Sequence, residues 1–190
     1  MSYEAKVGLS NKHLHLKAED IEKLFGKGHK LTVMKDLVQP GQYACEEKVD
    51  IVGPKGTLKG VRVLGPARPE TQVELSMTDA RAIGIPAMVR ESGKLEGTPG
   101  CKLIGPAGEV DLSYGVIVAL RHVHLSGPQA EEAGVKDKDI VSLRIGGERG
   151  TVFNNVLIRA GEGHEKEVHL DTDEGNAAGC GSDTVAEIIK

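Results

Sequence analysis

The sequence predicts a mainly β protein built from two small β-barrel domains that are related by internal duplication and carry short helices. Three observations predict this fold: frequent glycine-rich turns, short apolar runs between the turns, and two copies of a His-x-His pattern. The chain has 190 residues, of which 25 are Gly, and many Gly residues stand in turn-like contexts such as GPKG and GPAG. Short apolar runs separated by such turns are typical of strands in small closed barrels.

The composition narrows the class of protein further. Hydrophobic residues make up 39% of the chain, but aromatic residues make up only 3%, so we expect an aliphatic core. A net charge of -4 without a cluster of Lys and Arg argues against a nucleic-acid partner. The sequence shows neither a long apolar run nor a secretory signal, so no membrane partner is expected. The three widely spaced cysteines favour a reducing, cytoplasmic location.

The duplication is visible in two pairs of segments. LSNKHLHL at residues 9–16 and LRHVHL at residues 120–125 each carry the His-x-His pattern, and each is followed by a sequence typical of a helix start. VELSMTDARAIGI at residues 73–85 aligns with VHLDTDEGNAAGC at residues 168–180, and both predict a strand, a short helix and a Gly stop. In this alignment Glu74 falls on His169.

The remaining elements follow in chain order. Residues 17–28 and 126–139 predict helices, and Ser126 with Gln129 predicts a capping box at the second one. Short strands are expected within residues 48–66 and 139–161, where Gly-containing turns interrupt apolar runs. The C-terminal SDTVAEIIK is expected to be a short helix or a strand that closes one barrel.

We therefore expect a first barrel domain at residues 1–90 and a second at residues 91–190. The boundary lies in a Pro- and Gly-containing stretch at residues 85–115, and an exchange of strands between the halves is allowed there.

The His-x-His pattern has a chemical interpretation. On a strand, side chains alternate between faces, so two His residues separated by one residue lie on the same face, about 6.6 Å apart along the strand. A single pair is more often incidental, but two copies at matching places favour metal binding. Each half offers three ligands, which suits a catalytic zinc with an open position. The six expected ligands are His13, His15, Glu74, His122, His124 and His169. The other two histidines, His29 and His164, are expected to be merely exposed.

Several longer motifs resemble one family. VGLSNKHLHL, LTVMKDLVQPGQYACEE, VRVLGPARPETQVELSMTDA, VRESG, RHVHL and EVHLDTDEGNAAG occur in this order. Together they resemble the phosphate propanoyltransferases, the PduL-type phosphotransacylases, from about residue 5 to about residue 180.

The resemblance implies two β-barrel domains with a two-metal site between them, usually holding zinc. It implies reversible transfer of a short acyl group, acetyl or propanoyl, between coenzyme A and phosphate. The family's ligand pattern falls on the six residues named above, and Arg68 matches a residue of its phosphate site. A homodimer is also plausible from the family. The chain lacks the N-terminal extension that directs some members into microcompartments, so a free cytoplasmic enzyme is expected.

Two mechanisms and two other functions stay open. Phosphate can attack the thioester directly, or an acyl group can pass through a cysteine, for which Cys45 is the candidate. The alternative functions are a dinuclear metal-dependent hydrolase and a non-catalytic metal-binding barrel. Arg90, Glu91 and Arg121 have either a site role or a surface role. Asp171 and Asp173 are either helix-start residues or hydrogen-bond partners of His169, and Asn176 either caps a turn or contacts the substrate.

Overall fold

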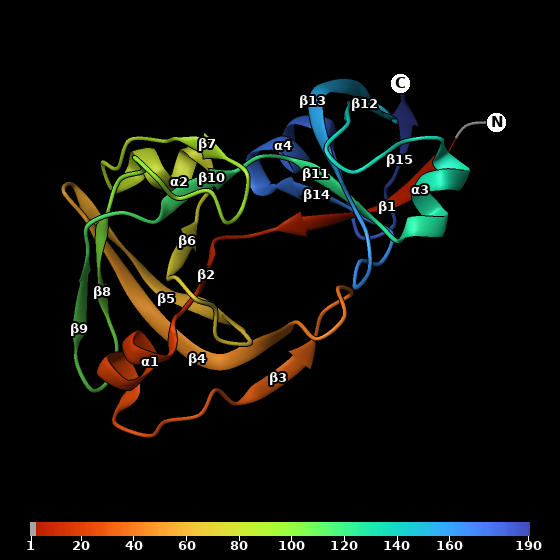
Figure 1. Ribbon diagram of the computed structural model, residues 1–190. Helices are drawn as coiled ribbons and strands as arrows, with labels where there is room; N and C mark the ends of the chain where they lie inside the picture. The colour runs from red at the N-terminus through yellow and green to blue at the C-terminus, as the bar shows by residue number, and fades with distance from the viewer. Residues whose placement is uncertain (1–2) are drawn as a thin grey trace. The chain divides into compact units, whose positions relative to one another are not determined.

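The computed structural model describes residues 3–190 and separates them into two compact units, each with its own core (Figure 1). We call the first the barrel unit; it contains residues 3–10, 38–40 and 120–190. We call the second the sheet unit; it contains residues 11–37 and 41–119. The prediction of a mainly β fold with two barrel-like domains is confirmed.

The barrel unit is a closed barrel of strands joined edge to edge around a core of aliphatic side chains. Its strands, in their order around the barrel, are β1 (Tyr3–Ser10), β14 (Glu167–Asp171), β11 (His122–Leu125), β13 (Thr151–Ala160), β12 (Ile140–Ile145) and β15 (Val185–Ile189). Alternate residues of β12 and β15 are buried, as expected for strands with one face on a core. The C-terminal segment is therefore a strand that closes the barrel, the second of the two predicted forms.

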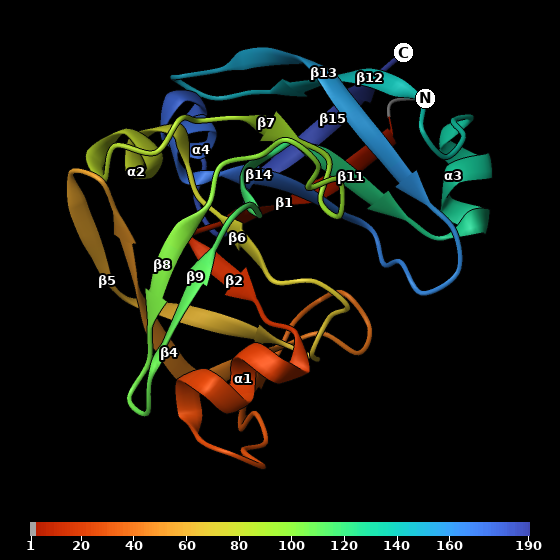
Figure 2. The ribbon, with the colours of Figure 1, turned by 60° about the vertical axis from the view of Figure 1, so that its left-hand side comes forward.

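The sheet unit is a nine-stranded sheet curved into part of a barrel. Its strands along the sheet are β7 (Val89–Arg90), β10 (Val116–Ala119), β6 (Gln72–Glu74), β2 (His13–His15), β5 (Gly56–Gly65), β4 (Tyr43–Gly53), β8 (Cys101–Ile104) and β9 (Glu109–Leu112), with β3 (Val33–Asp36) paired to β4. The long hairpin of β4 and β5 turns through Pro54 and Lys55, within the predicted GPKG turn. Figure 2 shows this hairpin beside the shorter pair of β8 and β9.

The helices are short and lie where the sequence predicts them. They are α1 (Ala18–Phe25), α2 (Met77–Ala82), α3 (Gly127–Ala133) and α4 (Thr172–Ala178). Ser126 and Gln129 form the predicted capping box of α3. Gly84 and Gly179 follow α2 and α4 with φ of 76° and 67°, so both helices stop at a left-handed glycine.

The two halves of the chain repeat one strand arrangement. β2 lies between the parallel β5 and the antiparallel β6, and β11 lies between the parallel β13 and the antiparallel β14. On the far side of β6 lies β10, and on the far side of β14 lies β1, both in parallel pairing. The same register holds in both pairs, because Val116 is opposite Val73 and Val7 is opposite Val168.

The division into units differs from the predicted boundary at residue 90. The strand before each His-x-His pattern belongs to the other half's sheet: β1 pairs with β14 and β15, and β10 pairs with β6 and β7. The chain therefore passes between the units after Ser10 and after Ala119. Backbone pairing of these strands, which apolar patterns do not encode, places residues 91–119 in the sheet unit.

Candidate metal centres

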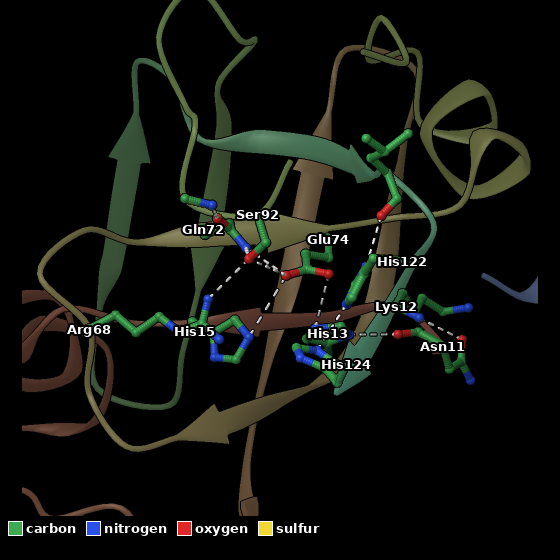
Figure 3. A network of polar contacts seen from close by, with 12 residues as sticks. Asn11, Lys12, His13, His15, Arg68, Gln72, Glu74, Ser92, His122 and His124 are labelled. Carbon is green, nitrogen blue, oxygen red and sulfur yellow. Dashed lines mark hydrogen bonds and ion pairs between the residues drawn. The ribbon is translucent and has the colours of Figure 1, made fainter. Parts of the chain in front are cut away.

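The first group of ligands lies in the sheet unit. His13, His15 and Glu74 each offer one ligand atom, and these atoms all lie within 4.8 Å of one another. The pairing of β2 with β6 produces this group, because His13 stands directly opposite Glu74. His13 Nε2 lies 3.4 Å from Glu74 Oε2, and His15 Nε2 lies 3.8 Å from Oε1. Figure 3 shows the three side chains directed toward one another.

The second group of ligands lies in the barrel unit. His122, His124 and His169 offer ligand atoms that also lie within 4.8 Å of one another. His122 stands opposite His169 across β11 and β14, as His13 stands opposite Glu74. The Nε2 atoms of His122 and His124 are 3.1 Å apart. Each group therefore unites the three residues that the sequence predicts for its half.

The spacing of these atoms fits a small tetrahedral cation. Zinc–nitrogen bonds of about 2.05 Å at tetrahedral angles place neighbouring ligand atoms roughly 3.3 Å apart. The 3.1 Å between the Nε2 atoms of His122 and His124 and the 3.4 Å between His13 Nε2 and Glu74 Oε2 lie around this value. Three ligands per group also leave one tetrahedral position for a substrate atom.

Backbone carbonyls select the ligand nitrogen of two histidines. His13 Nδ1 donates to the Asn11 carbonyl and His122 Nδ1 donates to the Leu120 carbonyl, both at 2.8 Å. A neutral imidazole with its proton on Nδ1 has its lone pair on Nε2. The two Nε2 atoms are therefore prepared to bind a cation.

Electrostatics keep further ligands in the form that binds metal. Burial and the charge of Arg68 lower the pKa of His15 to about 3. Burial also lowers the pKa of His124, and the adjacent His122 and His169 rings add to this effect. Burial alone would raise the pKa of Glu74, but His13, His15 and Arg68 hold it well below its usual range. At neutral pH the group thus presents a neutral imidazole at His15 and a carboxylate at Glu74.

Arg68 lies beside the ligands of the sheet unit. Its Nη1 donates to Ser92 Oγ at 3.4 Å, and Ser92 Oγ donates to Glu74 Oε1 at 3.5 Å (Figure 3). Its backbone N–H donates to the Leu16 carbonyl, which ties the Arg68 loop to the end of the His-x-His segment. The guanidinium is thus a positive group close to, but not part of, the cluster of ligands.

The environment of Cys45 does not favour a reactive thiolate. Its side chain is fully buried in the core of the sheet unit. Burial, followed by the nearby Glu47, raises the pKa of its thiol to about 11. A thiol in this environment stays protonated near neutral pH, which is the unreactive form.

Three of the other candidates make local contacts or lie at the surface of the structure. Asp171 is the N-cap of α4 and accepts from Glu174 N–H, so its helix-start role is the one observed. Arg121 forms an ion pair of 2.8 Å with Glu174 and also donates to the Asn154 carbonyl. Asn176 is exposed on α4.

The sequence interpretation missed several side chains that contact the ligands. His164, expected to be merely exposed, is partly buried, and its Nδ1 lies 2.9 Å from His124 Nδ1. Glu167 bonds to His169, and Gln72 bonds to Glu74. The position of Gln72 and Glu167, two residues before a predicted ligand on a strand, was the available signal.

The fold and the two ligand groups define a class: a mainly β protein with two duplicated sets of side chains that could hold a metal ion. A model of the phosphate propanoyltransferase family matches residues 6–181. The phosphate propanoyltransferase of Thermotoga maritima is 53% identical over 185 residues, which span 97% of this chain and 88% of that protein. That of Clostridioides difficile is 49% identical over the same spans. That of Salmonella typhimurium is 53% identical over 175 residues, which span 92% of this chain and 83% of that protein.

The chain belongs to the phosphate propanoyltransferase family, and it is an acyltransferase. This confirms the resemblance seen in the sequence motifs. Within residues 3–190, no helix is both long enough and apolar enough to cross a membrane.

Proposed function

We propose that this enzyme transfers a short acyl group, acetyl or propanoyl, reversibly between coenzyme A and phosphate, with one zinc ion at each ligand group. The observation that carries the proposal is the grouping of His13, His15 and Glu74 within 4.8 Å beside the guanidinium of Arg68. A cation and an arginine side by side suit an anionic substrate such as phosphate. Family membership supports the phosphate acyltransferase reaction itself.

Zinc, when bound, supplies a Lewis acid that stabilises negative charge on an oxygen or a thiolate. His13, His15 and Glu74 hold the ion in the sheet unit, and His122, His124 and His169 hold the ion in the barrel unit. The three-ligand sets leave room for substrate atoms, as a catalytic rather than a structural site requires.

Arg68 binds and orients phosphate in this proposal. A guanidinium can donate two parallel hydrogen bonds to two phosphate oxygens, which an ammonium group cannot match. The Ser92 hydroxyl and the Leu16 carbonyl support the side chain and the backbone of Arg68, respectively. Its orientation is thus set before phosphate arrives, which lowers the entropic cost of binding.

Direct attack is the mechanism that the chain's own residues support. An oxygen of phosphate attacks the thioester carbonyl carbon, the carbon–sulfur bond breaks, and coenzyme A leaves as a thiolate. The alternative acyl-cysteine route requires an accessible thiolate, whereas Cys45 is fully buried and has a raised pKa.

The test is an assay of coenzyme A release from acetyl-CoA and propanoyl-CoA. Protein stripped of metal is assayed with and without added zinc, and with and without phosphate. Release that requires both zinc and phosphate, with acyl phosphate as the product, is the expected result. The relative rates with the two thioesters then give the acyl preference.

Two outcomes would contradict the proposal. Release that requires zinc but not phosphate would indicate the dinuclear hydrolase. Full phosphate-dependent release by protein that analysis shows to be free of metal would exclude a catalytic role for zinc. The expected cytoplasmic location and the expected homodimer stay predictions.

A further inference from the structure

Two residues outside the ligand sets hold the same place in the two halves. Glu167 comes two residues before His169 on β14, and Gln72 comes two residues before Glu74 on β6. When VEL at 73–75 is aligned with VHL at 168–170, Gln72 falls on Glu167. Side chains separated by two residues on a strand share a face, so each of these residues lies next to its ligand.

Both residues form a hydrogen bond to that ligand. Glu167 Oε2 lies 2.7 Å from His169 Nε2, and Gln72 Nε2 lies 2.5 Å from Glu74 Oε1. The donor and acceptor roles in this hydrogen bond are reversed between the halves. The imidazole ligand has a carboxylate that accepts its N–H, whereas the carboxylate ligand has an amide that donates to it. Each neighbour therefore has the chemistry that its own ligand needs.

The orientation of Gln72 is fixed by its other contacts. Its Oε1 accepts from Gly93 N–H at 2.7 Å, and its Nε2 also donates to Ser92 Oγ at 2.9 Å (Figure 3). An amide turned the other way would place its oxygen against the Glu74 carboxylate and its nitrogen against a backbone N–H. The contacts thus hold the NH₂ group toward Glu74.

Glu167 is held in a comparable way in the barrel unit. Gln39 Nε2 donates to Glu167 Oε2 at 3.3 Å, and Gln39 also bonds to the backbone of Glu165 on both its amide atoms. Gly8 on β1 lies opposite His169, and a Cβ at Gly8 would come within 2.6 Å of Glu167 Oε1. The missing side chain at Gly8 leaves the space that the carboxylate occupies.

We propose that Glu167 and Gln72 are a duplicated pair of positioning residues, each of which orients the third metal ligand of its group. Glu167 accepts the Nε2 proton of His169, which leaves the lone pair on Nδ1 for a cation. Gln72 fixes Oε1 of Glu74, which leaves Oε2 for a cation. Outer hydrogen-bond partners of this kind fix ligand tautomer and orientation and typically change metal affinity by 10- to 100-fold.

The inference rests on the proposed metal sites, so its test measures metal binding rather than activity. Full-length protein is stripped of metal and titrated with zinc against a chromophoric chelator. We expect Glu167→Gln to raise the dissociation constant of one ion by about tenfold, and Gln72→Met to raise that of the other ion similarly. The double variant should weaken both ions. In cobalt-loaded protein, each single variant should shift the visible absorption spectrum, which reports the ligand field directly.

Matched controls separate positioning from a general structural effect. Glu47→Gln removes another carboxylate, a buried one that bonds to a histidine, His29, at 2.8 Å, but in a place that holds no ligand. Gln129→Met removes another bonded amide, in the capping box of α3. Both controls should bind two zinc ions with the affinity and cobalt spectrum of the unaltered protein.

Three results would overturn the positioning role of Glu167 and Gln72. Unchanged zinc affinity and cobalt spectrum in Glu167→Gln or Gln72→Met would overturn the positioning role. Equal losses in the controls would show that the effect is structural and would overturn it as well. If the unaltered protein binds no zinc or cobalt, the proposed metal centres themselves fail, and the positioning role fails with them.

Discussion

At the scale of single residues, adjacent positions on one strand hold a candidate ligand and a core side chain. Leu14 and Val123, the central residues of the two His-x-His patterns, are fully buried in the cores of their units. The flanking His13 and His15 face the other way, with ring centroids 5.3 Å apart. The period of two on a strand explains both facts, and it was sufficient to predict from the sequence that the two histidines share a face.

Replacing Arg68 with Lys tests the phosphate role at this scale. We expect kcat/KM for phosphate to fall by about 10- to 100-fold, because Lys loses the two-point contact and about 1.5–3 kcal/mol of charge-assisted hydrogen bonding. Steady-state kinetics with phosphate varied, together with a zinc titration, measure the effect. Zinc affinity should change little, because Arg68 is not a ligand.

Arg81→Lys is the control for this variant, because Arg81 is exposed on α2. It should retain the kinetics of the unaltered enzyme. A phosphate kcat/KM of Arg68→Lys that equals that of Arg81→Lys would show that Arg68 does not bind phosphate.

Replacing Cys45 with Ala tests the rival mechanism. Because the thiol is buried and has a pKa raised to about 11, we expect activity within about twofold of the unaltered enzyme. A small loss of stability, about 1 kcal/mol, should follow from the removed core volume. Coenzyme A release and urea unfolding measure the two effects. A loss of activity of a thousandfold or more in a folded variant would instead favour an acyl-cysteine intermediate.

At the scale of elements, local signals predicted the helix ends and turns, but no pattern in the sequence predicted which strands pair. The capping box at Ser126, the glycine stops at Gly84 and Gly179, and the aligned strand–helix segments are all observed. These features depend on neighbours within a few residues, so the sequence encodes them directly. Both partners of β1 are about 160 residues or more away along the chain, as the pairing of Val7 with Val168 and of Tyr3 with Ile188 shows. No local pattern specifies such a pairing.

The contact between β4 and the segment before β3 gives a prediction about pH. Glu47 on β4 accepts from Thr32 N–H at 3.0 Å and from His29 at 2.8 Å. Burial would raise the pKa of Glu47, but these hydrogen bonds outweigh it and leave the pKa below its usual range. The folded state therefore releases the proton more readily than the unfolded state does.

The resulting stabilisation is present above the unfolded pKa of about 4.3 and is lost as pH falls through the lower folded pKa. Glu47→Gln should lower the free energy of unfolding by about 1–3 kcal/mol at pH 7, and by less at pH 4 and below. Urea unfolding at a series of pH values measures the difference. A difference that stays constant from pH 7 to pH 3 would show that ionisation of Glu47 contributes nothing.

At the scale of the whole molecule, metal removal gives the broadest prediction. A ligand that binds only the folded state adds about 4 kcal/mol when its free concentration is a thousand times its dissociation constant. For a chain of this size, such a change corresponds to roughly 10 °C in the melting temperature. Because the proposal places two ions in each chain, we expect a chelator to lower the melting temperature by about twice this amount and zinc to restore it.

Calorimetry on chelated and zinc-restored protein measures this effect. The variant His13→Ala with His122→Ala, which removes one ligand from each group, should melt at nearly the same temperature in both conditions. An unaltered protein whose melting temperature ignores both chelator and zinc would contradict the metal proposal.

The sequence by itself determined the class of fold, the helix ends and the six candidate ligands. Strand periodicity and helix capping depend on residues close together in the chain, and the duplication is visible when the two halves are aligned. The tertiary structure decided which strands share a sheet, and so it moved β1 into the barrel unit and residues 91–119 into the sheet unit. It also revealed His164, Glu167 and Gln72 beside the ligands, and it placed Cys45 in the core. Strand pairing, the contact of His164 with His124 and the burial of Cys45 depend on residues distant in the chain, which only the folded backbone brings together. Glu167 and Gln72 are only two residues from their ligands, so the strand period placed them on the same face, but the hydrogen bonds themselves are seen only in the structure.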